Sequence, residues 1–155
     1  MYRDRFGVLK GGRWYAMPGE GGLLMCTWPR GGAEKAAGKG DPTFVGYFNE
    51  CMTGFEYQVA SHMVWEGLVE QGLAVTRMIH DRYAPSKRNP YNEVECSSHY
   101  ARAMASHGVF IAACGFDYHG PRGHHAFAPR VGADAFRAAF VTAEGWGLYR
   151  QDREA

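Results

Sequence analysis

The chain has 155 residues, about the size of one domain. Its 17 basic and 16 acidic residues leave a formal net charge of +1, and no basic stripe runs along the sequence, so we expect no nucleic-acid partner. The apolar fraction of 46% argues against a largely disordered chain, and no apolar run reaches the roughly 18–20 residues that a membrane span needs.

Glycine pairs punctuate the first third of the chain, at Gly11-Gly12, Gly21-Gly22 and Gly31-Gly32. Short aromatic-rich runs lie between these pairs and end at prolines, which is typical of strands joined by turns. We therefore predict that residues 1–48 form a segment of strands and loops.

The middle of the chain, residues 49–115, has helical periodicity. Apolar positions at steps of three and four predict a helix over residues 50–66 and a second helix that starts at Leu68 and ends before Pro85. A third helix is expected to open at Ser97 or Ser98, both good N-cap residues, and to close at Gly115. The predicted apolar faces are Met52, Phe55, Val59 and Met63 in the first helix, Leu68, Gly72, Val75 and Ile79 in the second, and Tyr100, Ala103, Met104, His107, Ile111 and Cys114 in the third. Short connections between these helices predict antiparallel hairpins.

The last segment, residues 116–155, returns to the pattern of the first third. Residues 117–123 read as a turn cluster, and aromatic runs over residues 125–129, 136–141 and 144–149 are candidate strands. The chain is therefore predicted to be mainly α-helical with short β segments.

Acidic residues stand at two of the predicted helix starts. Glu93 precedes the third helix and Arg102 lies inside it, so we expect the carboxylate and the guanidinium to converge on one polar ligand. Glu50 precedes the first helix, and paired carboxylates at a suitable separation can divide the acid and base roles of glycoside hydrolysis. The structural alternative is a carboxylate that stabilises a helix N-terminus by about 0.3–1 kcal/mol beside an exposed arginine.

Metal and cofactor sites have weaker support. Asp117, His119, His124 and His125 could imitate a metal site, but their spacing matches no zinc signature and falls in a glycine- and proline-rich turn. The glycine pairs lack the strand–GxGxxG–helix context of a dinucleotide fold. We therefore assign neither a metal nor a cofactor. The four cysteines contain no C-x-x-C pair and no secretory signal is visible, which favours reduced thiols in a cytoplasmic protein.

Several stretches together form a familiar series of motifs. They are Asn49-Glu50-Cys51-Met52-Thr53-Gly54, Arg88-Asn89-Pro90-Tyr91-Asn92-Glu93-Val94-Glu95-Cys96, His99-Tyr100-Ala101-Arg102-Ala103-Met104-Ala105-Ser106, Gly115-Phe116-Asp117-Tyr118-His119-Gly120-Pro121, Phe127-Ala128-Pro129-Arg130 and Glu144-Gly145-Trp146-Gly147. From about residue 12 to residue 150, the chain resembles the C-terminal part of glycoside hydrolase family 116, the relatives of non-lysosomal glucosylceramidase and bile-acid β-glucosidase.

The resemblance implies part of an (α/α)6 toroid, in which helical hairpins surround a sugar-binding cleft, and a retaining β-glycosidase activity. In the family the carboxylate nucleophile and the acid/base both precede the matched segment. Residues 1–155 would then be a C-terminal fragment of the catalytic domain, inactive alone, with the upstream part and a glycoside as its partners. By motif match, Glu50, Glu93 and Arg102 would hold sugar hydroxyls, whereas Met52 stands where the family usually has tryptophan.

Two other functions remain open at this point. A non-catalytic carbohydrate-binding module would use the aromatic surplus, since Phe, Trp and Tyr make up 14% of the chain. A metal-stabilised interaction module would use the group formed by Asp117, His119, His124 and His125.

Overall fold

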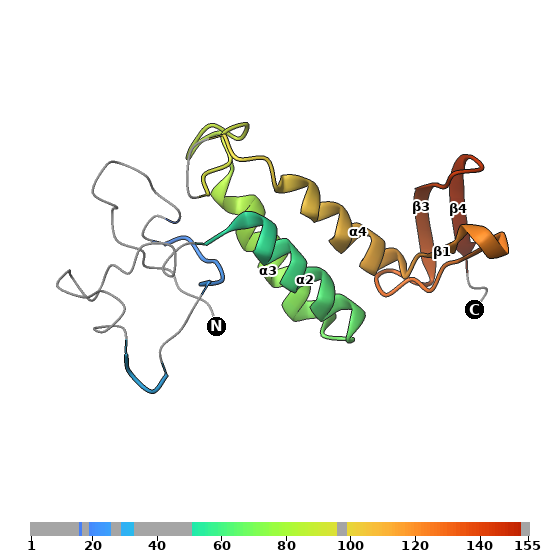
Figure 1. The fold of residues 1–155 in the computed structure, drawn as a ribbon, viewed down its shortest axis with the longest axis horizontal. Helices are drawn as coiled ribbons and strands as arrows, with labels where there is room; N and C mark the ends of the chain where they lie inside the picture. The colour runs from blue at the N-terminus through green and yellow to red at the C-terminus, as the bar shows by residue number, and fades with distance from the viewer. Residues whose placement is uncertain (1–15, 17–18, 26–28, 33–50, 96–98, 153–155) are drawn as a thin grey trace.

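The computed structural model describes residue 16 and residues 19–25, 29–32, 51–95 and 99–152. Within these ranges three α-helices lie side by side, and the strands lie beyond the C-terminal end of the last helix (Figure 1). The elements are α2 (Thr53–Trp65), α3 (Val69–Arg82), η2 (Ala103–Ala105), α4 (Ser106–Cys114), β1 (Asp117–His119), η3 (Gly120–Arg122), β2 (His124–Ala126), β3 (Ala135–Val141) and β4 (Trp146–Asp152).

Helix α2 is the centre of the helical part, because it packs against both α3 and α4. Gly72 permits the close approach of α3, since a Cβ at this position would lie only 2.7 Å from the Ala60 carbonyl oxygen. The small core between the helices consists of buried Ala60, Val75, Ile79 and Val109. Two glycines in the left-handed region end helices as predicted: Gly67, with φ of +84°, follows α2, and Gly115, with φ of +55°, caps α4.

The buried faces agree only partly with the predicted ones. In α3 the predicted Gly72, Val75 and Ile79 are buried, together with Arg82. In α2 the predicted face is wrong: Phe55 is 39% exposed, and the buried face is shifted by one position to include Glu56. A glutamate is a poor candidate for a core position in sequence reasoning, but here Arg82 of α3 neutralises it. Of the face predicted for the third helix, Cys114 in α4 is buried, whereas Met104 in η2 is exposed.

The C-terminal part forms two antiparallel strand pairs. β1 pairs with β2, and β3 pairs with β4 in a register that places Ala138 opposite Tyr149. Aromatic rings connect the two pairs, led by Phe127 and Tyr149, whose rings stack at 4.1 Å with an interplanar angle of 2°. Residues 117–119 were predicted as part of a turn and form β1 instead, because they bond to residues 124–126 across a short 3-10 turn.

The predicted partial (α/α)6 toroid, mainly α with short β segments, is wrong. The described residues contain three α-helices, of which α3 and α4 pack on α2 and do not form a ring of hairpins. They also contain four strands in two antiparallel sheets. The toroid was implied by the motif resemblance, whereas the described helices α3 and α4 pack on α2 and the C-terminal segment satisfies its backbone by the strand pairing that its sequence predicts. None of the described helices has the length and apolarity to cross a bilayer.

Candidate functional site

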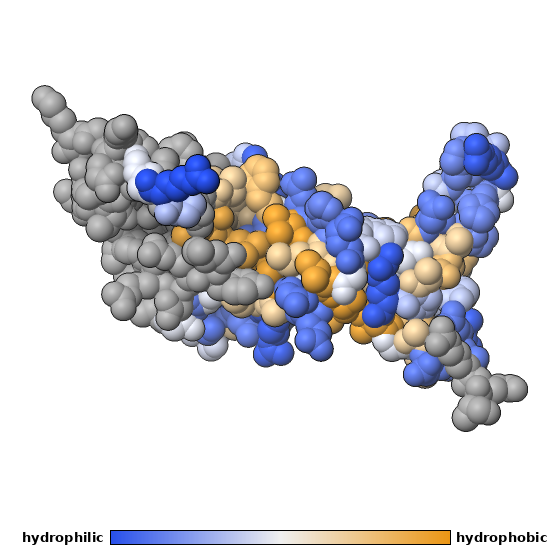
Figure 2. Space-filling view, turned by 90° about the horizontal axis from the view of Figure 1, so that it is seen from below, coloured by the Kyte–Doolittle hydropathy of each residue, from blue (hydrophilic) through white to orange (hydrophobic). Residues whose placement is uncertain are grey.

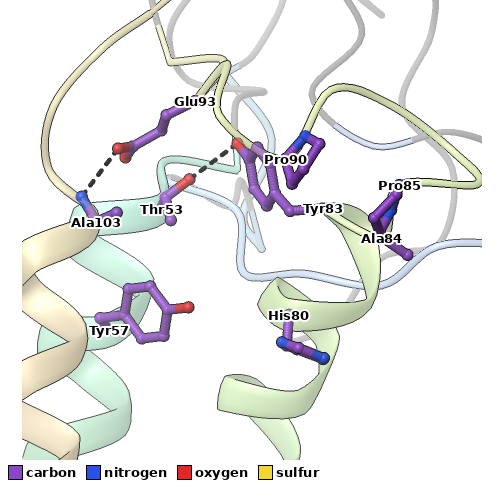
Figure 3. Close-up of a pocket in the computed structure, with 9 residues that line it drawn as sticks. All are labelled: Thr53, Tyr57, His80, Tyr83, Ala84, Pro85, Pro90, Glu93 and Ala103. Carbon is purple, nitrogen blue, oxygen red and sulfur yellow. Dashed lines mark hydrogen bonds between the residues drawn. The ribbon is translucent and has the colours of Figure 1, made fainter.

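A pocket of about 410 Å³ opens between the start of α2, the end of α3 and the start of η2 (Figure 3). This volume lies in the range of roughly 300–1,000 Å³ that is usual for small-molecule sites. The polar side chains that line it are Thr53, Tyr57, His80, Tyr83 and Glu93. Pro85 and Pro90 form part of its apolar wall.

Glu93 is the most unusual group in this pocket. Its side chain is nearly buried, with the residue only 7% exposed. One carboxylate oxygen, Oε2, accepts hydrogen bonds from the backbone N–H groups of Arg102 (2.9 Å) and Ala103 (2.8 Å). The other oxygen, Oε1, is buried and has no hydrogen-bond partner among the residues that the structure describes. Because buried polar atoms are nearly always bonded, an unsatisfied carboxylate oxygen on a residue that lines a pocket makes Glu93 a candidate ligand-binding residue.

Two hydrogen bonds fix the loop that carries Glu93, one to Tyr83 before it and one to Tyr100 after it. The Val94 N–H donates to the Tyr83 hydroxyl at 3.1 Å, and the Tyr100 N–H donates to the Glu93 carbonyl oxygen at 3.0 Å. The predicted helix start at Ser97 or Ser98 lies outside the described residues, and helical structure begins at Ala103. Glu93, ten positions earlier in the chain, therefore takes the capping role that a local serine was expected to fill.

Arg102 directs its guanidinium away from Glu93. Nη1 donates to Oε1 of the buried Glu95 at 2.6 Å, and Nη2 donates to the Tyr100 hydroxyl at 3.1 Å. The guanidinium also lies over the rings of Phe55 and Tyr100, at 5.0 and 4.8 Å from their centroids. Gly54 allows this position, since a Cβ there would lie 2.7 Å from the Arg102 Cβ.

The two predicted binding groups thus serve different cavities. Glu93 lines the pocket of Figure 3, whereas Arg102 lines a second pocket of about 570 Å³ with Phe55, Gln58 and Ser61. The structure joins the Glu93 carboxylate to the backbone of Arg102 and does not bring the two charged heads together. The expected convergence on one ligand is therefore not observed.

Hydroxyl groups supply the other polar contacts of the Glu93 pocket. The Thr53 and Tyr83 hydroxyl oxygens are 3.2 Å apart and share a hydrogen bond (Figure 3). Burial raises the pKa of Tyr57, so its hydroxyl stays protonated at neutral pH and can donate. Sequence reasoning missed all three residues, because single hydroxyl side chains in helices carry no functional pattern.

A buried ion pair positions the helices that form the pocket. Arg82 Nη1 donates to Glu56 Oε1 at 3.0 Å, and Arg82 Nη2 donates to Glu56 Oε2. Two groups from an upstream segment complete this arrangement: the Gly21 carbonyl accepts from Arg82 at 2.9 Å, and the Leu23 N–H donates to Glu56 at 2.7 Å. Burial lowers and the Glu56 carboxylate raises the pKa of Arg82, with a net increase, so the guanidinium stays charged.

Two further predictions concern Glu50 and the candidate metal group on residues 117–125. Glu50 lies outside the described residues. Asp117, His119, His124 and His125 lie on β1 and β2, and the part of the chain that the structure describes contains no group of three or more His, Cys, Asp or Glu arranged to hold a metal ion. The metal-stabilised alternative has no support at these residues.

The chemistry of the Glu93 pocket is that of hydrogen bonding to a small polar ligand. It combines a free anionic acceptor, hydroxyls that donate and accept, and the faces of Tyr57 and Tyr83. No protein-family model matches the sequence, and no curated protein is significantly similar to it. The functional interpretation accordingly depends on this geometry.

Proposed function

We propose that the Glu93 pocket binds a sugar unit, and that the chain is the sugar-binding portion of a retaining β-glycosidase. The observation that carries this proposal is that Glu93 lines the pocket while its buried Oε1 has no partner among the described residues. A sugar hydroxyl would donate to this oxygen and remove the cost of a buried, unsatisfied acceptor.

The rest of the pocket supports a polyhydroxylated ligand. Thr53 and Tyr83 offer hydroxyls that can both donate and accept, and Tyr57 adds a protonated hydroxyl and an aromatic face. Sugars present hydroxyls at the ring edge and C–H groups at the ring face, so such a lining matches both surfaces. The volume of about 410 Å³ is sufficient for a small ligand.

The proposed catalytic setting follows from the motif resemblance to glycoside hydrolase family 116. A retaining mechanism needs a nucleophile and an acid/base, both carboxylic groups. We place these groups in an upstream part of the catalytic region that would partner this chain, with a glycoside as substrate. The chain by itself is then expected to bind a sugar without cleaving it. The proposed location is the cytoplasm, which the free thiol of the buried Cys114 supports.

The proposal is tested by titrating the full chain with methyl β-glucoside and following binding by calorimetry. We expect saturable binding to the wild type. Glu93→Gln keeps an amide oxygen that can cap η2 but places a donor where an acceptor is needed, so affinity should fall by about 10- to 100-fold, the equivalent of a lost charged hydrogen bond. The matched control is Glu66→Gln, at an exposed glutamate, which should bind as the wild type does. Absent binding, or equal binding by Glu93→Gln, would contradict the proposal.

A non-catalytic carbohydrate-binding role is the second candidate, and one observation favours it. The described lining of the pocket contains a single carboxylate, whereas hydrolysis uses two. The nucleotide sequence immediately upstream distinguishes the candidates. An adjacent reading frame that completes a glycosidase and carries two acidic residues supports the first, and a complete, unrelated gene supports the second.

A further inference from the structure

We infer that the sugar unit bound at Glu93 carries a protonated amino group, which donates to the free Oε1. This inference rests on the proposed function and names the class of sugar within it. It follows from the distribution of charge around the pocket, which leaves one carboxylate without a cation among the described residues.

Glutamates and arginines near the pocket occur in pairs. Each of three arginines binds a glutamate other than Glu93. The pairs are Arg82 with Glu56, Arg88 with Glu20, and Arg102 with Glu95. Glu93 is the remaining buried glutamate, and its partners among the described residues are two backbone N–H groups, both on Oε2.

A charged ligand fits this position better than a neutral one. The partial positive charge of the helix start acts mainly on Oε2, which it faces. A hydroxyl at Oε1 would satisfy the hydrogen bond but would leave a nearly buried negative charge without a counterion, which is costly. An ammonium group supplies both a hydrogen bond and the missing positive charge.

The pocket wall also suits a cation. Its described lining residues include no lysine or arginine that would repel an ammonium group, and the basic side chain among them is the imidazole of His80. Arg88 covers the ring of Tyr83 at 5.8 Å, but this guanidinium is bound to Glu20. Tyr57 projects from α2 into the pocket with its hydroxyl end toward the middle (Figure 3), and its ring can hold a cation against its face.

The test compares three sugars of similar ring structure on the full chain: glucosamine, glucose and N-acetylglucosamine, the last of which is neutral. Calorimetric titration should give glucosamine an affinity about tenfold higher than that of glucose, the difference between a charged and a neutral hydrogen bond. N-acetylglucosamine should show no such advantage. In Glu93→Gln the preference for glucosamine should disappear, and in the control Glu66→Gln it should remain.

The outcomes separate this inference from the proposed function. Equal affinity for glucose and glucosamine, or a preference that persists in Glu93→Gln, overturns the inference and leaves sugar binding intact. Failure of all three sugars to bind overturns both. If circular dichroism shows that Glu93→Gln does not fold, Tyr57→Leu replaces it, and the ratio of glucosamine to glucose affinity should then fall by about threefold because the aromatic face is lost. An unchanged ratio in a folded Tyr57→Leu overturns the inference.

Discussion

The helical part of the molecule buries several charged side chains, whereas the strand part exposes large apolar side chains on its surface. Residues 51–95 bury Glu56, Arg82, Glu93 and Glu95. In residues 117–152, Ala138 is the one buried hydrophobic residue that the structure describes, and Trp146 is 86% exposed. The helices also show apolar surface between polar side chains (Figure 2). Buried charges need specific partners, so the helical part is held in one arrangement around the pocket, whereas ring stacking in the strand part tolerates change.

The largest expected effect comes from breaking the buried pair with Arg82→Met. This change leaves the Glu56 carboxylate buried without its cation, and we expect the free energy of unfolding to fall by about 3–5 kcal/mol in urea titrations. Arg77→Met is the matched control, because the Arg77–Asp81 pair is exposed and should contribute less than about 0.5 kcal/mol. Equal losses in the two variants would remove the contrast between buried and exposed charge.

The second-largest effect is expected from Glu93→Ala, which removes the carboxylate that caps η2. Two backbone N–H groups, of Arg102 and Ala103, lose their acceptor, and stability should fall by about 1–2 kcal/mol. Amide hydrogen exchange at Ala103 should become faster. Glu93→Gln should lose less, because its amide oxygen can still accept. Unaltered exchange in Glu93→Ala would show that the cap does not hold this helix start.

A smaller effect is expected in the strand part from Phe127→Leu. The stack on Tyr149 is lost while most of the apolar volume stays, so the free energy of unfolding should fall by about 1 kcal/mol. Chemical shifts of the Tyr149 ring should change and those of Ala60 should not. Trp146→Leu, on the exposed face, should stay within about 0.5 kcal/mol of the wild type. Changes that spread to Ala60 would mean that the two parts are not independent.

The smallest effect is a change in titration at the surface of the strand part. The Tyr118 hydroxyl donates to Glu144 at 2.7 Å, which lowers the pKa of Glu144 and raises that of Tyr118. This bond stabilises the fold above the ordinary carboxyl pKa, and the contribution disappears as the pH falls through the lowered value. In Tyr118→Phe the pKa of Glu144, measured by NMR, should rise. The exposed control Tyr91→Phe should leave it unchanged.

Local signals in the sequence were enough to place most of the elements. The periodic apolar residues of α2 and α3 and the glycines at positions 67 and 115 mark helices whose ends the structure confirms within a few residues. The runs at 136–141 and 144–149 became β3 and β4. These features depend on neighbours in the chain, which is why pattern and turn chemistry find them.

The missed features depend on contacts between distant residues. The buried face of α2 includes Glu56 because of Arg82, 26 positions away, and no pattern within the helix shows this. The start of η2 depends on Glu93, and the toroid, which only the motif resemblance implied, does not form because α3 and α4 both pack on α2. Glu93 itself was predicted as a site residue, but the pairing of Arg102 with Glu95 redirects the guanidinium to another pocket.

The contact of residues 21–23 with Arg82 and Glu56 has a consequence for how the protein can be divided. A shortened chain that started at residue 51 would keep all three described helices, yet it would strip the Gly21 carbonyl from one side of the ion pair and the Leu23 amide from the other. The described residues 21–23 therefore belong to the same packed unit as α2 and α3. Any truncated variant of the protein should therefore retain residues 21–23.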